Sequence, residues 1–225
     1  MEHNTLDDFK WISGVLGLCA AIFTGAGEFL LHFDPQARFT DGLAFFEGIS
    51  ESRSNWGHFL SIAGAPLYAV GAFHLFLMLK PANTRWAFIL FAIMAYGCAL
   101  GGVWMGSRAS ISALVNAPQF AELGNLVALY DLRYETLLNV TRLAILWVSI
   151  IYIWLVSSGR SCYPRWMALF NPILLLLFSF AIWLIMPAIG KYMMPIALNI
   201  AFFIFFSLSL YFVRQERIIL RISQE

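Results

Sequence analysis

The sequence predicts an all-α integral membrane protein, a bundle of six transmembrane helices forming a single membrane domain over residues 1–225. Hydrophobic residues make up 60% of the chain and charged residues only 12%, whereas soluble domains hold about 45–50% and about 25%. The apolar residues form long continuous runs, unlike the short alternating segments of a membrane β-barrel. Each run reaches the length of roughly 20 residues that a helix needs to cross a bilayer.

Six runs meet this length, and their approximate bounds are 12–33, 57–80, 85–106, 136–157, 166–188 and 193–213. The first is interpreted as a retained helix, because Asp7 and Asp8 stand where a signal peptide carries positive charge and the apolar run is too long. Six spans place both ends of the chain on one side of the membrane.

The distribution of Lys and Arg orients the spans, because cytoplasmic loops carry the excess of positive charge. The side that holds both ends of the chain carries Lys10, Lys80, Arg85, Arg160, Arg165, Arg214, Arg217 and Arg221. The opposite side carries fewer, namely Arg38, Arg53, Arg108, Arg133 and Lys191. This predicts an N-in/C-in protein of the plasma or inner membrane.

The two longer connections, 34–56 and 107–135, then face outward. Apolar residues recur at roughly helical spacing in 39–50 and 109–130, which predicts short helices on the membrane surface or capping the bundle. Pro118 divides the second segment. Such helices serve either as a lid or as a structural cap.

Composition also excludes several classes of function. A net charge of +1 offers no basic surface for nucleic acid. Cys19, Cys98 and Cys162 are too few and too scattered for a disulfide framework. Small residues that let helices approach closely recur in two overlapping patterns, Gly97–Gly101–Gly102–Gly106. We interpret them as packing within the chain, which leaves an oligomer open.

Ionisable residues inside the spans carry most of the functional information, because each needs a partner or a cavity in lipid. Glu28 and His32 share a helix face at i, i+4, with Glu28 roughly 7–8 Å below the outer boundary. A polar stripe runs along the helix of the fourth span, near its start, and consists of Asp131, Glu135, Asn139 and Arg142. We expect these faces to wall an outward-facing polar cavity, in which Glu28 pairs with Arg142.

One hypothesis for this cavity is a divalent metal site. Glu28, His32, Asp34 and His58 supply nitrogen and oxygen ligands that suit Zn²⁺, and a bound ion with an open position activates water. Hydrolysis of a lipid ester or amide at the outer interface would follow.

A second hypothesis is acid/base chemistry without a metal. Glu28 acts as the acid or base, and His32 and His58 exchange protons with it. Substrate-binding groups are Asn139, Arg142, Arg108 and Glu135. In both cases the protein is an enzyme acting on a lipid or other amphiphile in the outer half of the bilayer, with membrane lipids as its partners.

Two alternatives remain open. A buried Glu–Arg pair also suits a small proton-coupled transporter or an amphiphile-binding membrane protein. The same residues also suit a structural membrane protein with no catalytic site, in which ion pairs only fix the helix packing. His74, in the inner half, is interpreted as a hydrogen-bonded interior histidine rather than a ligand.

Overall fold

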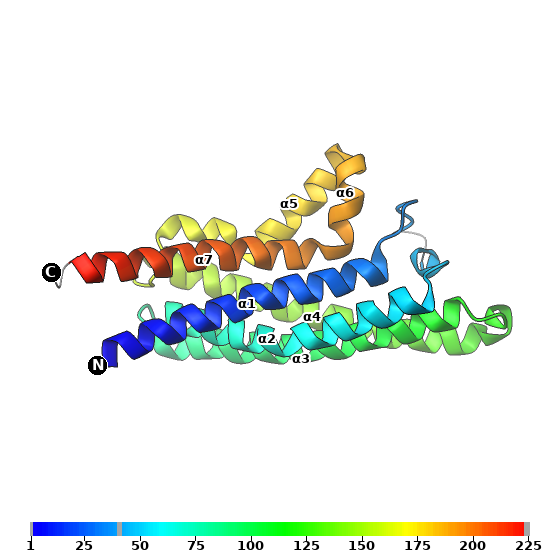
Figure 1. Cartoon of the computed structure of the whole chain (residues 1–225), viewed down its shortest axis with the longest axis horizontal. Coiled ribbons are helices and arrows are strands. Elements are labelled where there is room, and N and C mark those ends of the chain that lie inside the picture. Colours follow the sequence, from blue (N-terminus) through cyan, green and yellow to red (C-terminus); the bar gives the residue numbers. More distant parts are fainter. Residues whose placement is uncertain (1, 40–41, 223–225) are drawn as a thin grey trace.

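The computed structural model describes residues 2–39 and 42–222 as a bundle of helices, with no strand in these ranges (Figure 1). The α-helices are α1 (Glu2–His32), α2 (Glu51–Leu79), α3 (Thr84–Val115), α4 (Gly124–Ser157), α5 (Pro172–Ile185), α6 (Pro187–Met193) and α7 (Ala197–Ile222). Short 3₁₀ turns join them at η1 (Ala44–Phe46), η2 (Phe120–Leu123), η3 (Arg165–Phe170) and η4 (Met194–Ile196).

Most of the helices run along the long axis of the molecule. Figure 1 shows α1 to α4 passing back and forth, α7 returning beside α1, and both ends of the chain at the same end of the bundle. In the described part of the chain, the stretches long and apolar enough to cross a membrane are Leu6–His32, Glu51–Leu79, Thr84–Val115, Phe120–Ser157 and Pro187–Ile218. These five helices confirm the predicted all-helical class and its compatibility with a membrane.

The predicted fifth span, 166–188, is not one continuous helix. It consists of η3, the 14-residue α5 and the start of α6. Asn171 caps α5 by accepting from the backbone N–H groups of Ile173 and Leu174, and Pro187 opens α6. At about 1.5 Å per residue α5 is roughly 21 Å long, short of a bilayer core of about 30 Å. Figure 1 shows it tilted away from the other helices.

The outer connections also differ from the prediction. Helix α3 continues to Val115 and α4 begins at Gly124, so most of 109–130 extends these helices, with Pro118 in the turn between them. In 39–50, η1 is the described helical element, and residues 40–41 lie outside the described ranges. Asn116 fastens this loop to α3, since its side chain donates to the Phe46 carbonyl at 2.9 Å and accepts from Gly48 N–H at 2.8 Å.

Helices α1 and α2 pack closely because glycines remove side chains from their contact. A Cβ added at Gly27 would collide with Ser61 and with the backbone carbonyl of Gly57. Near the other end, a Cβ at Gly17 or Gly71 would meet the ring of Phe206 from α7. Small residues allow this approach of helix backbones. By contrast, a Cβ at Gly101 of α3 would meet nothing within 4 Å.

His74 joins three elements at the end of the bundle that holds the termini. The ring is fully buried, with Nδ1 2.8 Å from the Lys10 carbonyl and Nε2 2.6 Å from Ser209 Oγ. Ser209 is in turn 2.6 Å from the hydroxyl of Tyr163. Both ring nitrogens therefore have partners, which confirms the interpretation of an interior histidine.

Asp34, just after α1, organises the opposite end. Its carboxylate accepts from Arg38 Nε at 2.9 Å and from the backbone N–H groups of Arg38 and Gln36 at 3.0 and 3.2 Å. Burial by itself raises the pKa of this carboxyl, but these hydrogen bonds outweigh burial and hold the pKa below its ordinary value.

Candidate functional site

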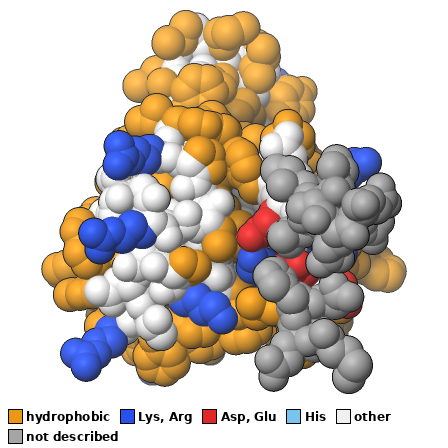
Figure 2. Space-filling model, turned by 90° about the vertical axis from the view of Figure 1, so that its left-hand side faces the viewer, with side chains coloured by type: hydrophobic (Ala, Val, Ile, Leu, Met, Phe, Trp, Pro, Cys, Tyr) orange, Lys and Arg blue, Asp and Glu red, His pale blue; other side chains and the backbone are white. Residues whose placement is uncertain are grey.

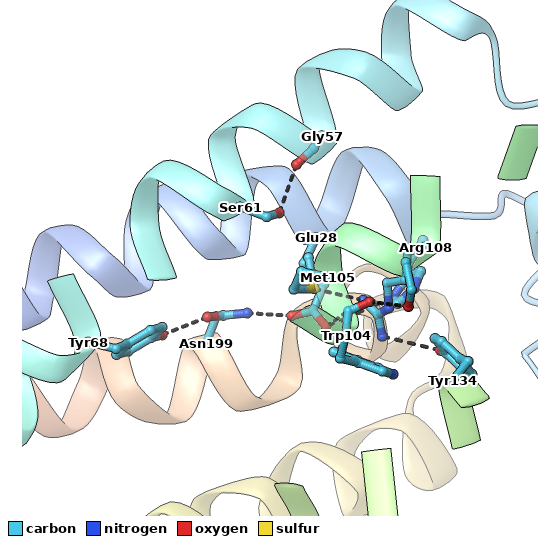
Figure 3. A network of polar contacts seen from close by, with 11 residues as sticks. Glu28, Gly57, Ser61, Tyr68, Trp104, Met105, Arg108, Tyr134 and Asn199 are labelled. Atoms are coloured by element: carbon cyan, nitrogen blue, oxygen red, sulfur yellow. Dashed lines mark hydrogen bonds and ion pairs between the residues drawn. The ribbon is translucent and has the colours of Figure 1, made fainter. Parts of the chain in front are cut away.

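A buried polar network centres on Glu28, on the penultimate turn of α1. Its Oε1 accepts from Arg108 Nη1 of α3 at 2.9 Å, and its Oε2 accepts from Asn199 Nδ2 of α7. Tyr68 of α2 extends the network by donating to Asn199 Oδ1 at 2.6 Å. Figure 3 shows these side chains in one line that links four helices.

Arg108 is held on several sides although only 3% of it is exposed. Its guanidinium carbon lies 3.3 Å from the centre of the Trp104 ring, one helical turn away on α3. Nη2 lies 3.4 Å from the Tyr134 hydroxyl of α4, and Nη1 lies 3.3 Å from Met105 Sδ. A planar cation stacked on an aromatic face and paired with a carboxylate is well suited to burial.

Two cavities meet at this network. The polar chamber has a volume of about 570 Å³, and Arg108, Tyr134, Glu135 and Arg142 line it together with the loop around Phe45. The apolar pocket is a smaller cavity of about 100 Å³. Its wall runs over α3, α4 and α7 and includes Gly97, Gly101, Gly102, Ile145, Val148 and Phe202.

Five residues line both the polar chamber and the apolar pocket, namely Glu28, Trp104, Thr141, Ile145 and Leu198. Glu28 of the buried ion pair therefore stands where a cavity with charged side chains on its wall meets an apolar one. Gly101 of α3 contributes to this space, because a side chain at that position would meet no neighbour within 4 Å.

The structure brings together three of the predicted site residues. Glu28 and His32 lie 3.9 Å apart, between Oε1 and Nδ1, as their i, i+4 spacing predicts. Arg108 completes the group, and all three line the polar chamber. His32 also packs edge-on against Phe45 and Phe46, with ring centres 5.2 and 5.7 Å away.

The predicted metal ligands do not form one cluster. The Asp34 carboxylate forms an ion pair with Arg38, and His58 lies on α2 beside Gly106 and Phe59. Within residues 2–39 and 42–222, no group of three or more His, Cys, Asp or Glu is placed to hold a metal ion. The zinc site therefore remains a sequence-based prediction with no ligand cluster in this part of the chain to support it.

The predicted pairing of Glu28 with Arg142 is wrong, because Arg108 is the partner of Glu28. Arg142 lies on the exposed side of α4, where it bonds Asn139 Oδ1 at 3.0 Å and lies 4.0 Å from Glu135. Asn139 is exposed, and Glu135 and Arg142 line the outer part of the polar chamber.

Sequence reasoning gave no site role to Tyr68, Trp104, Tyr134 or Asn199. Trp104 resembles an interface anchor by its position near a predicted span end, and a single Tyr in an apolar helix does not stand out. Asn199 is the one of these four residues that the sequence itself marks as a candidate for the site. It is a polar side chain well inside a span, and such a residue needs a partner in lipid.

Comparison with known proteins adds a family. A family model matches residues 9–216, and its description is a family of unknown function (DUF6796). No curated protein and no solved structure matches the chain.

Proposed function

We propose that this chain, which belongs to the family of unknown function DUF6796, is a multi-pass membrane protein that binds an amphiphile. The headgroup occupies the polar chamber, and the first few carbons of the hydrocarbon chain enter the apolar pocket between α3, α4 and α7, which measures about 100 Å³. Membrane ligand sites commonly lie between helices of a bundle, with a few polar groups fixing the orientation of an otherwise apolar molecule.

The observation that carries this proposal is the junction of the two cavities at Glu28 and Trp104. A purely polar solute would leave the apolar pocket empty, and a pure hydrocarbon would leave the charged chamber unused. An amphiphile matches both, because its own polarity changes along its length as the wall does.

Binding fits the geometry of Glu28 better than catalysis does. A general base needs a free oxygen within reach of the substrate proton. Both oxygens of Glu28 are occupied, one by Arg108 and one by Asn199. The proposed site therefore holds its ligand, and turnover of the bound amphiphile is an outcome that the experiment below also measures.

We further propose that the chain crosses an inner or plasma membrane six times, with both ends in the cytoplasm. Helix α5, preceded by η3, supplies the short passage. Figure 2 views the end with the termini and shows scattered Lys and Arg side chains within a hydrophobic margin. The turns at this end carry Lys80, Arg85, Arg160 and Arg165. The excess of positive charge on cytoplasmic loops supports this orientation.

A reporter fusion tests the orientation. A fluorescent protein that matures only in the cytoplasm is fused after the last residue, and alkaline phosphatase, active only outside, is fused there in a second strain. Fluorescence without phosphatase activity is expected. The opposite pattern would contradict the proposed orientation while leaving the binding site untouched.

Filling the apolar pocket tests the binding function. Gly101→Leu places a side chain into open space, so the fold is expected to survive while the pocket closes. Val103→Leu is the matched control, since Val103 lies on the same helix and is 61% exposed on the outside of the bundle. Purified protein in nanodiscs is titrated with radiolabelled 1-lauroylglycerol, and the recovered probe is analysed for hydrolysis.

Saturable binding to the wild-type chain and to Val103→Leu is expected, with at least a tenfold loss in Gly101→Leu. Equal binding by Gly101→Leu would show that the pocket does not hold the probe. If lauric acid is released, and Glu28→Gln abolishes the release, the chain is an enzyme that hydrolyses the amphiphile and the proposed binding function is wrong.

A further inference from the structure

Two buried N–H donors on side chains that line the polar chamber have no hydrogen-bond partner among the described residues. They are Nε of Arg108 and Nε1 of Trp104. Arg108 is 3% exposed and Trp104 is 9% exposed, and both side chains line the polar chamber. Figure 3 shows the two side chains stacked against each other beside Glu28.

Both groups can only donate. Neither a guanidinium nor an indole nitrogen accepts a hydrogen bond, so no rearrangement between the two satisfies either of them. Leaving a buried donor unpaired destabilises the fold, because the group loses its hydrogen bond to water and gains none in return. The group that belongs here therefore carries acceptor atoms, and its oxygen is expected within hydrogen-bond reach of these two N–H groups.

The charges around the polar chamber restrict that acceptor further. Arg108 and Arg142 are its described cations, whereas Glu28, Asp131 and Glu135 are its described carboxylates. The positive charge of Arg108 is already matched by Glu28 at 2.9 Å. An anionic headgroup would enter a lining in which the described carboxylates outnumber the described Arg side chains, and it would compete with Glu28 for the Arg108 guanidinium.

We propose that the ligand of this site is a neutral amphiphile whose headgroup presents oxygen acceptors, such as an ester or ketone carbonyl or a hydroxyl. The inference rests on the proposed binding function and specifies its substrate class. Trp104 acts as a specificity-determining residue by donating Nε1–H to the headgroup oxygen, and its ring keeps Arg108 in place.

Three probes with saturated chains of closely similar length separate the headgroup chemistries. The probes are 1-lauroylglycerol, which is neutral with acceptors, dodecyl phosphate, which is an anion with acceptors, and dodecyltrimethylammonium, which is a cation without acceptors. Competition against radiolabelled 1-lauroylglycerol on the wild-type chain in nanodiscs is expected to rank the neutral probe first. This ranking requires no variant.

Trp104→Phe then removes the donor and retains an aromatic ring under Arg108. Affinity for 1-lauroylglycerol is expected to fall about three- to tenfold, the range of one hydrogen bond. Affinity for dodecyltrimethylammonium, which cannot accept, is expected to stay unchanged. Trp147→Phe is the matched control, because Trp147 is 56% exposed on the outside of α4.

The outcomes test the neutral headgroup separately from the proposed amphiphile-binding function. If none of the three probes binds, the amphiphile-binding function fails. If dodecyl phosphate or dodecyltrimethylammonium binds tightest, and Gly101→Leu abolishes that binding, the binding function stands and the neutral headgroup is wrong. Equal losses for all probes in Trp104→Phe would reduce Trp104 to a packing residue.

Discussion

Breaking the Glu28–Arg108 pair is the most direct test of the site. Glu28→Gln removes the negative charge but keeps the shape of the side chain, and Arg108→Met removes the positive charge. The exposed pair of α4 supplies the control through Arg142→Gln, because Arg142 and Glu135 are 4.0 Å apart with side chains 62% and 48% exposed.

The expected magnitude follows from burial. The side chains of Arg108 and Glu28 are 4% and 11% exposed and 2.9 Å apart. Removing one member of a buried pair costs about 3–5 kcal/mol, because the other charge stays buried without a partner. At roughly 2–4 °C per kcal/mol for a chain of this size, either variant is expected to lower the Tm by about 6–20 °C. An exposed pair contributes about 0–1 kcal/mol, so Arg142→Gln is expected to shift the Tm by a few degrees at most.

Thermal unfolding in nanodiscs, followed by tryptophan fluorescence, measures the wild-type chain and four variants: the three single variants and the double variant Glu28→Gln/Arg108→Met. The double variant is expected to lose less unfolding free energy than the two single variants lose together. The difference, which is the coupling free energy of the pair, is expected to be at least about 1.5 kcal/mol. Additive losses would refute the pairing. A loss in Arg142→Gln as large as that in Arg108→Met would refute the assignment of Arg108 as the partner.

The remaining predictions concern packing and charge elsewhere in the bundle. Gly27→Ala is expected to destabilise the protein because its Cβ collides with α2, whereas Gly101→Ala is expected to raise stability by about 0.5–1 kcal/mol through improved helix propensity, both measured by thermal unfolding. His74→Ala is expected to cost more stability than His74→Gln, which retains hydrogen-bonding groups toward Ser209, and equal Tm values would contradict that role. Asp34→Asn is expected to lower the Tm at pH 7, and this difference from the wild type should vanish at acidic pH. The reason is that a carboxyl with a depressed pKa stabilises the fold above its ordinary pKa of about 3.9. That stabilisation is lost as the pH falls through the lower pKa of the folded state.

Periodicity and composition predicted the helical class but not the ends of the helices. An apolar run shows where a helix lies in the hydrocarbon core, whereas α3 continues past the end of its apolar run to Val115. The prediction ended this helix at 106, which placed Arg108 at the membrane edge and made Arg142 appear to be the deep cation. The error in the partner of Glu28 therefore arose from an error of a few turns in a helix end.

The clustering of charge was more predictable than the pairing. Glu28, His32 and Arg108 lie together, as expected because a charged side chain in an apolar environment needs a partner. Which cation meets Glu28 depends on helix neighbours, and a single sequence does not reveal which helices pack side by side. The shape of the apolar pocket was equally hidden, because a glycine that permits close packing and one that leaves a cavity look alike in sequence. Gly27 and Gly101 are such a pair.

The arrangement along α2 and α7 favours the proposed binding function over coupled transport. One polar network ends at Tyr68, which bonds Asn199, and the other begins at His74, which bonds Ser209. Between them, Phe202 packs on Tyr68 at 5.1 Å and Phe206 packs on His74 at 6.1 Å, and the two Phe rings are stacked 6.1 Å apart. A transporter needs polar groups or water through both halves of the membrane. Two buried aromatic rings instead lie between the two networks, which supports the proposal of a site that takes its ligand from one side of the bilayer.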